Sequence, residues 1–159
     1  MPFQKTETYT LKEATRKLEG YCAYQERCHK EVVQKLKDMG MIPQAIDEIV
    51  YHLIRQNYLN EERFARSYAR GKFNTKKWGR NRIVSELRQR QISRFNIDTA
   101  LKEIDDTAYM ETLDSLSKKR LAQIKETHTQ KRRKKLADYL LYRGWESHLV
   151  YGKLKELIP

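Results

Sequence analysis

The side chains that could perform acid–base or metal chemistry do not gather into a recognisable site. The four histidines are scattered along the sequence, without an HExxH pair or another ligand spacing, at His29, His52, His128 and His148. The sequence also lacks a glycine-rich loop of the type that cradles phosphates. Glu86 stands alone among basic residues, and a lone carboxylate is poorly suited to nuclease chemistry. The sequence therefore predicts a protein that is not an enzyme and has no cofactor or metal.

The chemistry that the sequence does favour is the binding of a polyanion. The chain carries a net charge of +12. Residues 63–94 hold eleven Lys or Arg and one acid, which is a net +10, and residues 118–135 hold nine bases and one acid, a net +8. Like charges concentrated in this way repel one another, which favours a binding surface over a solvated face. We expect the partner to be nucleic acid or an acidic filament surface.

The first basic segment contains an arginine stripe. Arg63, Arg66 and Arg70 recur at spacings of three and four residues, which places them on one side of a helix. The stripe is interpreted as a phosphate or carboxylate contact, and a solvated helix face is the alternative. Arg63 lies next to Glu62, so it has a further interpretation as a structural ion pair with a neighbouring helix.

A second group of cations surrounds the connector Trp78-Gly79, where Gly79 is predicted to permit a tight turn. Several bases converge near the start of the next helix, whose free amide groups favour an anion. Trp78 either packs in the core between helices or stacks on a base. A third group, the run Lys131–Lys135, is either a second contact with the same partner or a solvated face. The predicted filament- or DNA-binding residues are Arg66, Arg70, Lys72, Lys76, Lys77, Arg80, Arg82, Arg88, Arg90, Lys131, Arg132, Arg133, Lys134 and Lys135.

The elements that position these cations are predicted to be helices in three repeats. When Leu36, Leu87 and Leu140 are aligned, seven apolar positions coincide without a gap, at offsets of 51 and 53 residues, which is typical of helical repeats. Each copy opens with its own helix, at about 10–27, 60–72 and 107–126. The sequence predicts an all-α, elongated tandem array of three three-helix units, at 10–57, 58–105 and 106–159, after a flexible N-terminus at 1–9.

Local signals mark the helix ends. Thr10 and Glu13 fit a capping box, and Asn60 is expected to cap the helix that follows it. Gly40 is predicted to end a helix in the left-handed conformation, and Pro43 suits a first turn.

Composition also limits the cellular setting. The N-terminus has no apolar core of a secretion signal, and no apolar run approaches the roughly 18 residues of a membrane span. Cys22 and Cys28 lie six residues apart within a helical pattern, so they are predicted to be buried free thiols rather than a disulfide or metal pair. We expect a cytoplasmic protein without a membrane partner.

Two stretches of the central segment resemble the signature of the RecX family of recombination regulators. They are NEERFARSYARGKF at residues 60–73 and KKWGRNRIVSELRQRQIS at residues 76–93, and HKEVVQKLKDMG at residues 29–40 is similar to the family's first-unit pattern. The resemblance covers about residues 14–157. Three positions depart from it: Asn60 stands where an acid is usual, Lys77 replaces the glycine before the aromatic residue, and Cys28 stands where serine is common.

The resemblance implies a non-enzymatic regulator of the RecA recombinase. Such a protein consists of tandem three-helix repeats, binds in the groove of the RecA–DNA filament, and limits filament growth and activity in homologous recombination, DNA repair and the SOS response. We expect this chain to act as a monomer. The resemblance also implies contact with single- or double-stranded DNA without sequence preference. The alternative is a free-standing nucleic-acid-binding protein, such as a helix-turn-helix protein, which would act on DNA alone rather than on a recombinase-coated strand.

Overall fold

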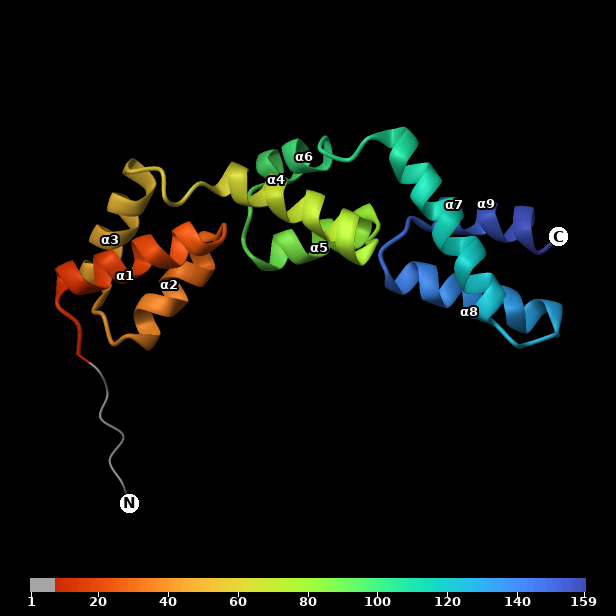
Figure 1. The fold of residues 1–159 in the computed structure, drawn as a ribbon, viewed down its shortest axis with the longest axis horizontal. Coiled ribbons are helices and arrows are strands. Elements are labelled where there is room, and N and C mark those ends of the chain that lie inside the picture. The colour runs from red at the N-terminus through yellow and green to blue at the C-terminus, as the bar shows by residue number, and fades with distance from the viewer. Residues whose placement is uncertain (1–7) are drawn as a thin grey trace, which may run out of the picture. The chain divides into compact units, whose positions relative to one another are not determined.

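The structure, a computed structural model, describes residues 8–159, and these residues form helices and no strand. The predicted all-α fold is thereby confirmed. The predicted flexible N-terminus lies, for residues 1–7, outside the described residues. In chain order the elements are α1 Leu11–Tyr24, α2 His29–Asp38, α3 Pro43–Arg55, α4 Glu61–Gly71, a π-helical turn η1 Lys72–Lys76, α5 Arg80–Gln89, α6 Arg94–Leu101, α7 Asp106–Gln123, α8 Thr129–Tyr142 and α9 Ser147–Leu157 (Figure 1).

The described helices belong to two compact units. One comprises the described residues up to Phe64 together with Arg90–Ile92, and the other comprises Ala65–Gln89 and Ser93–Pro159. The first unit therefore contains α1–α3, and the second contains most of the predicted second and third repeats. The predicted domain boundaries after residues 57 and 105 stay predictions.

The first unit is a three-helix cluster in which α1 and α3 begin at the predicted signals, whereas α1 ends at Tyr24 rather than near residue 27. The Glu13 amide donates to the Thr10 hydroxyl over 3.1 Å and the Thr10 amide donates to the Glu13 carboxylate over 3.4 Å, which confirms the capping box. Pro43 occupies the first turn of α3. Buried side chains from all three helices form the core, including Ala14, Leu18, Cys22, Val32, Leu36, Ile46, Ile49 and Leu53.

The repeat is visible in the backbone of the turn that follows the middle helix of each three-helix unit. Gly40, Gln91 and Gly144 occupy the same aligned position, and all three have positive φ, at 77°, 60° and 92°. In the first and third units the next amide closes the turn onto the aligned leucine: Met41 N–H donates to Leu36 O over 3.1 Å, and Trp145 N–H to Leu140 O over 3.2 Å. The aligned turns indicate that the three units share one backbone plan.

Burial also follows the predicted alignment, with one shift. Leu36, Leu87 and Leu140 are each fully buried, as is the residue four positions before each of them. At the last aligned position the first two units bury Leu53 and Ile104, whereas the third unit buries Ile158 rather than Leu157. The helix α9 ends at Leu157, so the chain leaves the helix there and the next side chain turns inward.

The cysteines are buried free thiols of the first unit, as predicted. Burial raises the pKa of the Cys22 thiol to about 11 and also raises the pKa of the Cys28 thiol. The Cys28 Sγ lies 3.4 Å from the Glu31 carboxylate, to which it donates a hydrogen bond.

Because only the thiolate reacts, both cysteines of the native protein should react with a disulfide reagent at pH 8 at least about 100-fold more slowly than in the denatured chain. The measurement is the rate of thiol release with Ellman's reagent, with and without concentrated guanidinium. Rapid modification of one thiol in the native protein would contradict the burial described here.

The second repeat contains an unusual link between α4 and α5. The helix α4 runs on into the π-helical turn η1, and the residue that follows η1, Lys77, is in the left-handed conformation with φ 57°. The Trp78 amide then donates to Lys72 O over 3.3 Å. The left-handed residue of this link is therefore Lys77, and Gly79 does not have a positive φ. Gly79 was predicted to permit a tight turn here, and the residue that adopts the left-handed conformation of the turn is Lys77 instead.

A lysine in the left-handed region costs roughly 1 kcal/mol relative to glycine. The change Lys77→Gly is therefore expected to raise the free energy of unfolding by about 0.5–1 kcal/mol, as measured by urea denaturation. The matched change Lys76→Gly falls one residue earlier, inside η1, and is expected to lower it by about the same amount. Two changes of the same sign would contradict this account.

Gly79 is required instead by a close approach between the second and third repeats. A Cβ at Gly79 would lie 2.4 Å from Gly144 O, and a Cβ at Gly144 would lie 2.3 Å from the Arg82 backbone nitrogen. Gly79 N–H donates to Arg143 O over 2.8 Å, and Asn81 N–H donates to Gly144 O over 2.9 Å. We call this contact between the start of α5 and the α8–α9 turn the glycine joint.

Aromatic packing continues the glycine joint into the core. Trp145 is 1% exposed, and its indole N–H donates to Lys77 O over 3.2 Å. Its ring centre lies 4.4 Å from that of Tyr109 on α7, and Tyr109 in turn lies 5.9 Å from Phe73. These rings bury apolar surface from both repeats, so the second and third repeats share one core.

Candidate functional site

One group of aromatic and basic side chains lies around Trp78, and we call it the cation–aromatic surface. It consists of Tyr68, Lys72, Trp78, Arg82 and Tyr142. The half-buried Trp78 ring has the Lys72 Nζ at 5.2 Å and the Arg82 guanidinium carbon at 4.2 Å from its centre. The Tyr68 ring lies 6.4 Å from it. The two distances from Lys72 and Arg82 are those of cation–π contacts, which hold the charged groups beside the Trp78 ring.

The third repeat contributes the other part of this surface. Arg82 lies 5.0 Å from the Tyr142 ring centre, and its guanidinium donates to Tyr142 O over 3.5 Å. The neighbouring Arg143 donates to Lys76 O over 3.1 Å and lies 4.5 Å from the ring centre of Tyr139. Tyr142 is 78% exposed, so an aromatic ring and several cations are accessible together.

Lys76 and Lys77 lie beside this surface and are exposed. No carboxylate of residues 8–159 forms an ion pair with either lysine. Their charges are therefore not neutralised locally. Together with the cation–aromatic surface they make a face suited to an anionic backbone and to the flat face of a base or another planar group.

Arg80 is held by partners in the third repeat. Its guanidinium forms ion pairs with Asp106 at 2.6 Å and Glu146 at 3.3 Å, and lies 3.8 Å from the ring centre of Tyr109. The Arg80 amide donates to the Tyr109 hydroxyl over 2.9 Å, and that hydroxyl donates to Glu146. Burial raises the pKa of Tyr109 far above its usual value, so the hydroxyl remains a donor.

The start of α5 is correspondingly closed. The amides of Gly79, Arg80 and Asn81 donate to Arg143 O, the Tyr109 hydroxyl and Gly144 O. The sequence-based reason for an anion site here, the free amides of a helix N-terminus, is therefore wrong, because protein acceptors already bind them. The accessible cations lie instead around Trp78.

The arginine stripe of α4 is partly neutralised. Arg66 and Arg70 contact the same carboxylate, Glu103, at 2.6 Å and 3.3 Å. The hydrogen bond from Arg66 is the main cause that lowers the pKa of Glu103. Arg63 pairs with Glu26 at 2.7 Å, which confirms the predicted structural ion pair, although Glu26 lies in the connection between α1 and α2 rather than on a helix. Arg66 and Arg70 stay predicted binding residues with a counter-charge between them.

The remaining predicted cations do not gather with those around Trp78. Arg88 is exposed on α5, and Arg90 lies 3.9 Å from Glu31 in the first unit. On α8, Arg133 donates to Ile158 O over 2.9 Å and Lys134 pairs with Asp138 at 2.7 Å. Of the other three bases on α8, Lys131 and Lys135 are exposed and Arg132 is half-buried.

Sequence reasoning did not find Tyr142 and Arg143, because they stand 60 and 67 positions from Arg82 and Lys76, the residues that they contact. A signal did exist: Arg143 precedes Gly144, which the alignment equates with Gly40. Within residues 8–159 no three His, Cys, Asp or Glu side chains are placed to hold a metal ion. Over the same residues no helix is both long enough and apolar enough to cross a membrane.

The comparisons with known proteins agree on one family. The family model described as "RecX, second three-helix domain" matches residues 60–101, and "RecX, third three-helix domain" matches residues 107–154. The chain is 30% identical over 139 residues to the regulatory protein RecX of Prosthecochloris aestuarii, covering 87% of this chain and 89% of that protein. It is 29% identical over 140 residues to that of Limosilactobacillus reuteri, covering 87% of this chain and 53% of the relative, so it spans about half that protein's length.

Two solved structures share the fold. One, a crystal structure of regulatory protein RecX, has a TM-score of 0.82 and 27% identity, and the match covers 92% of this chain and 73% of that one. The other, RecX from Lactobacillus salivarius, has a TM-score of 0.79 and 25% identity, covering 92% of this chain and 96% of that one. These matches support the array of three-helix units.

Proposed function

This chain belongs to the RecX family of regulatory proteins, and from that premise we propose that it regulates the RecA recombinase. It binds in the groove of the RecA–DNA filament and limits the growth and activity of the filament without chemistry of its own. The observation that carries this proposal is the gathering of the unpaired Lys76 and Lys77 with the cation–aromatic surface.

The surface suits a polyanion that is bound through its charge rather than recognised by its sequence. Lysine and arginine side chains that neutralise phosphates give an affinity that falls with salt, by about 0.9 in log K for each phosphate on duplex DNA. Acidic side chains of a protein filament would be attracted by the same charges. Trp78 and Tyr142 add planar contacts, which tolerate any base.

The glycine joint determines how this surface acts. Because backbone hydrogen bonds fix the start of α5 to the α8–α9 turn, the cations of the second and third repeats are held at set distances. Fixed charges lose little conformational entropy on binding. A rigid face of this kind can contact neighbouring recombinase subunits together, which hinders their exchange.

The test is the DNA-dependent ATPase activity of the cognate RecA in the presence of sub-stoichiometric amounts of this protein. Inhibition is expected with the wild type. The double variant Lys76→Glu/Lys77→Glu is expected to need at least about tenfold more protein for the same inhibition, because four charge units are removed from the surface. The binding of this variant to the RecA–DNA filament should also depend less steeply on salt, by about two units of slope.

The matched control is Lys12→Glu/Lys37→Glu, which makes the same charge change at exposed positions of the first unit. The inhibition of the RecA ATPase by this control is expected to stay within about twofold of that by the wild type, because salt screens the effect of charges far from the binding surface. Tight, salt-sensitive binding to bare DNA without any effect on the recombinase would reject the proposal. That result would favour a free-standing nucleic-acid binder, for which the half-buried Trp78 provides a stacking platform.

A further inference from the structure

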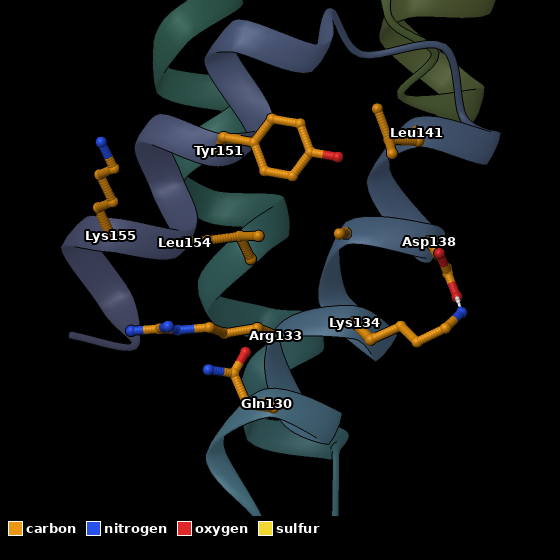
Figure 2. A pocket seen from close by; sticks show the side chains of 9 residues that line it. Gln130, Arg133, Lys134, Asp138, Leu141, Tyr151, Leu154 and Lys155 are labelled. Atoms are coloured by element: carbon orange, nitrogen blue, oxygen red, sulfur yellow. Dashed lines mark hydrogen bonds and ion pairs between the residues drawn. The ribbon is translucent and has the colours of Figure 1, made fainter.

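A groove on the third repeat shares no residue with the cation–aromatic surface. It runs between α8 and α9 and has a volume of about 590 Å³ (Figure 2). Its floor is formed by Ala137 and Leu154, which are nearly buried, and its sides by Leu141 and Tyr151. Leu141 is 37% exposed and Tyr151 is 53% exposed. In Figure 2 the Tyr151 side chain extends from α9 across the groove toward Leu141 on α8.

The margin of this groove is basic. Arg133, Lys134 and Lys155 line it, and the one carboxylate among the lining residues is Asp138, paired with Lys134 at 2.7 Å. The lining therefore carries a net positive charge around an apolar floor. Figure 2 shows the Lys134–Asp138 pair on the side of α8 and Lys155 on the side of α9.

Comparison with the other two repeats shows that the fold does not require this apolar pair. In the first and second repeats one of these two aligned positions holds a basic residue and the other an acidic residue, and all four side chains are exposed. The equivalents are Lys37 and Arg88 for Leu141, and Asp47 and Asp98 for Tyr151. Two units thus adopt the same helix pair with charged residues at these positions, and only the third exposes a leucine and a tyrosine there. An exposed apolar pair that the fold does not need indicates an interaction site.

We propose that the α8–α9 groove binds an amphipathic helical segment of a partner protein. The segment inserts apolar side chains between Leu141 and Tyr151 and carries acidic residues on its flanks, facing Arg133 and Lys155. Recognition of this kind uses apolar anchors one helical turn apart in an apolar groove, with charge setting the orientation. The inference goes beyond the proposed function, because it requires neither the cation–aromatic surface nor a polyanion.

A protein segment fits this groove better than nucleic acid does. The Arg133 guanidinium is bound to Ile158 O and Lys134 is bound to Asp138, so two of the three cations are already partly satisfied. The accessible centre of the groove is a leucine side chain and a tyrosine ring over an apolar floor. Apolar side chains of a partner that cover this centre lower the free energy of the complex, because apolar surface is removed from water. A sugar–phosphate backbone offers no such groups.

The test begins with a phage-displayed library of 12-residue peptides selected on the full chain. Selected peptides are expected to share two apolar residues three or four positions apart, with aspartate or glutamate around them. A fluorescently labelled synthetic copy is then titrated with the wild type and variants, and binding is followed by anisotropy. Tyr151→Gln is expected to weaken binding at least about tenfold. Lys155→Glu should also weaken it, because it reverses the charge at the margin.

The control is Tyr24→Gln, which removes an 83% exposed tyrosine from the first unit and is expected to leave the affinity unchanged. Thermal melting of each variant checks that the fold is retained, and Leu141→Gln provides a second lesion on the opposite wall of the groove. Selected peptides without the acidic and apolar pattern, or with unchanged affinity for both groove variants, would overturn the proposal. The proposal would also be overturned, in favour of nucleic acid, if the Tyr151→Gln change lowered the affinity for a single-stranded oligonucleotide of about 20 nucleotides.

Discussion

Replacing Gly144 by alanine is expected to lower the free energy of unfolding by about 3 kcal/mol or more. Two costs add at this position. The residue has φ 92°, a conformation that side chains rarely adopt, and an added Cβ would lie 2.3 Å from the Arg82 backbone nitrogen. Since the neighbouring atom belongs to the backbone of α5, the α5 start must move away and the glycine joint must open.

Two other glycines separate these costs. Gly40 occupies the equivalent turn with φ 77°, but nothing lies within 4 Å of an added Cβ, so Gly40→Ala should cost only about 1 kcal/mol. Gly152→Ala falls in open space on α9 and should stabilise the protein by up to about 1 kcal/mol. Urea denaturation of the three variants checks the order. Equal losses for Gly144→Ala and Gly40→Ala would show that the joint contributes nothing.

Arg80→Glu is expected to destabilise the protein by about 2–4 kcal/mol, the second large effect. The change leaves Asp106 and Glu146 without their shared cation and adds a third carboxylate beside them. Glu146 also accepts the hydroxyl of the buried Tyr109, so the loss reaches the core that the second and third repeats share. Thermal or urea denaturation measures it.

The matched variant is Arg88→Glu, at an exposed position on the same helix, where a change within about 0.5 kcal/mol is expected. If the Arg80→Glu variant proved as stable as the Arg88→Glu variant, the ion pairs of Arg80 would contribute little to the free energy of unfolding, as exposed ion pairs usually do. A stability loss at Arg80 also means that charge reversal there does not report on binding. Lys76 and Lys77 serve that purpose because no carboxylate of the described residues holds them.

Much of the fold could be predicted from the sequence, because helix periodicity and turn chemistry are local. The aligned apolar positions around Leu36, Leu87 and Leu140 predicted the repeat, Gly40 predicted a left-handed helix end, and Thr10 and Glu13 predicted the first cap. Lys77 was harder. A lysine carries no sign that it ends a π-helical turn with φ 57°, and only the family resemblance marked glycine as usual there.

The candidate site could be predicted only in part, because its geometry depends on long-range contacts. Periodicity showed that cations lie near Trp78, but not which of them find partners. Arg80 meets Asp106 and Glu146, which stand 26 and 66 residues further along the chain. A sequence pattern limited to neighbouring turns does not reveal such pairs, so Arg80 and Lys76 looked equivalent although one is held by two carboxylates.

The glycine joint has a consequence for how this surface can diverge between species. Its hydrogen bonds run from main chain to main chain, through the amides of Gly79 and Asn81 to the carbonyls of Arg143 and Gly144. Apart from the two glycines, no particular side chain is needed to form them. Replacing the exposed Lys76 or Lys77 by another residue with a side chain is therefore expected to leave these hydrogen bonds intact. Selection can retune what the surface recognises, one charge at a time, while the framework that presents it is inherited unchanged.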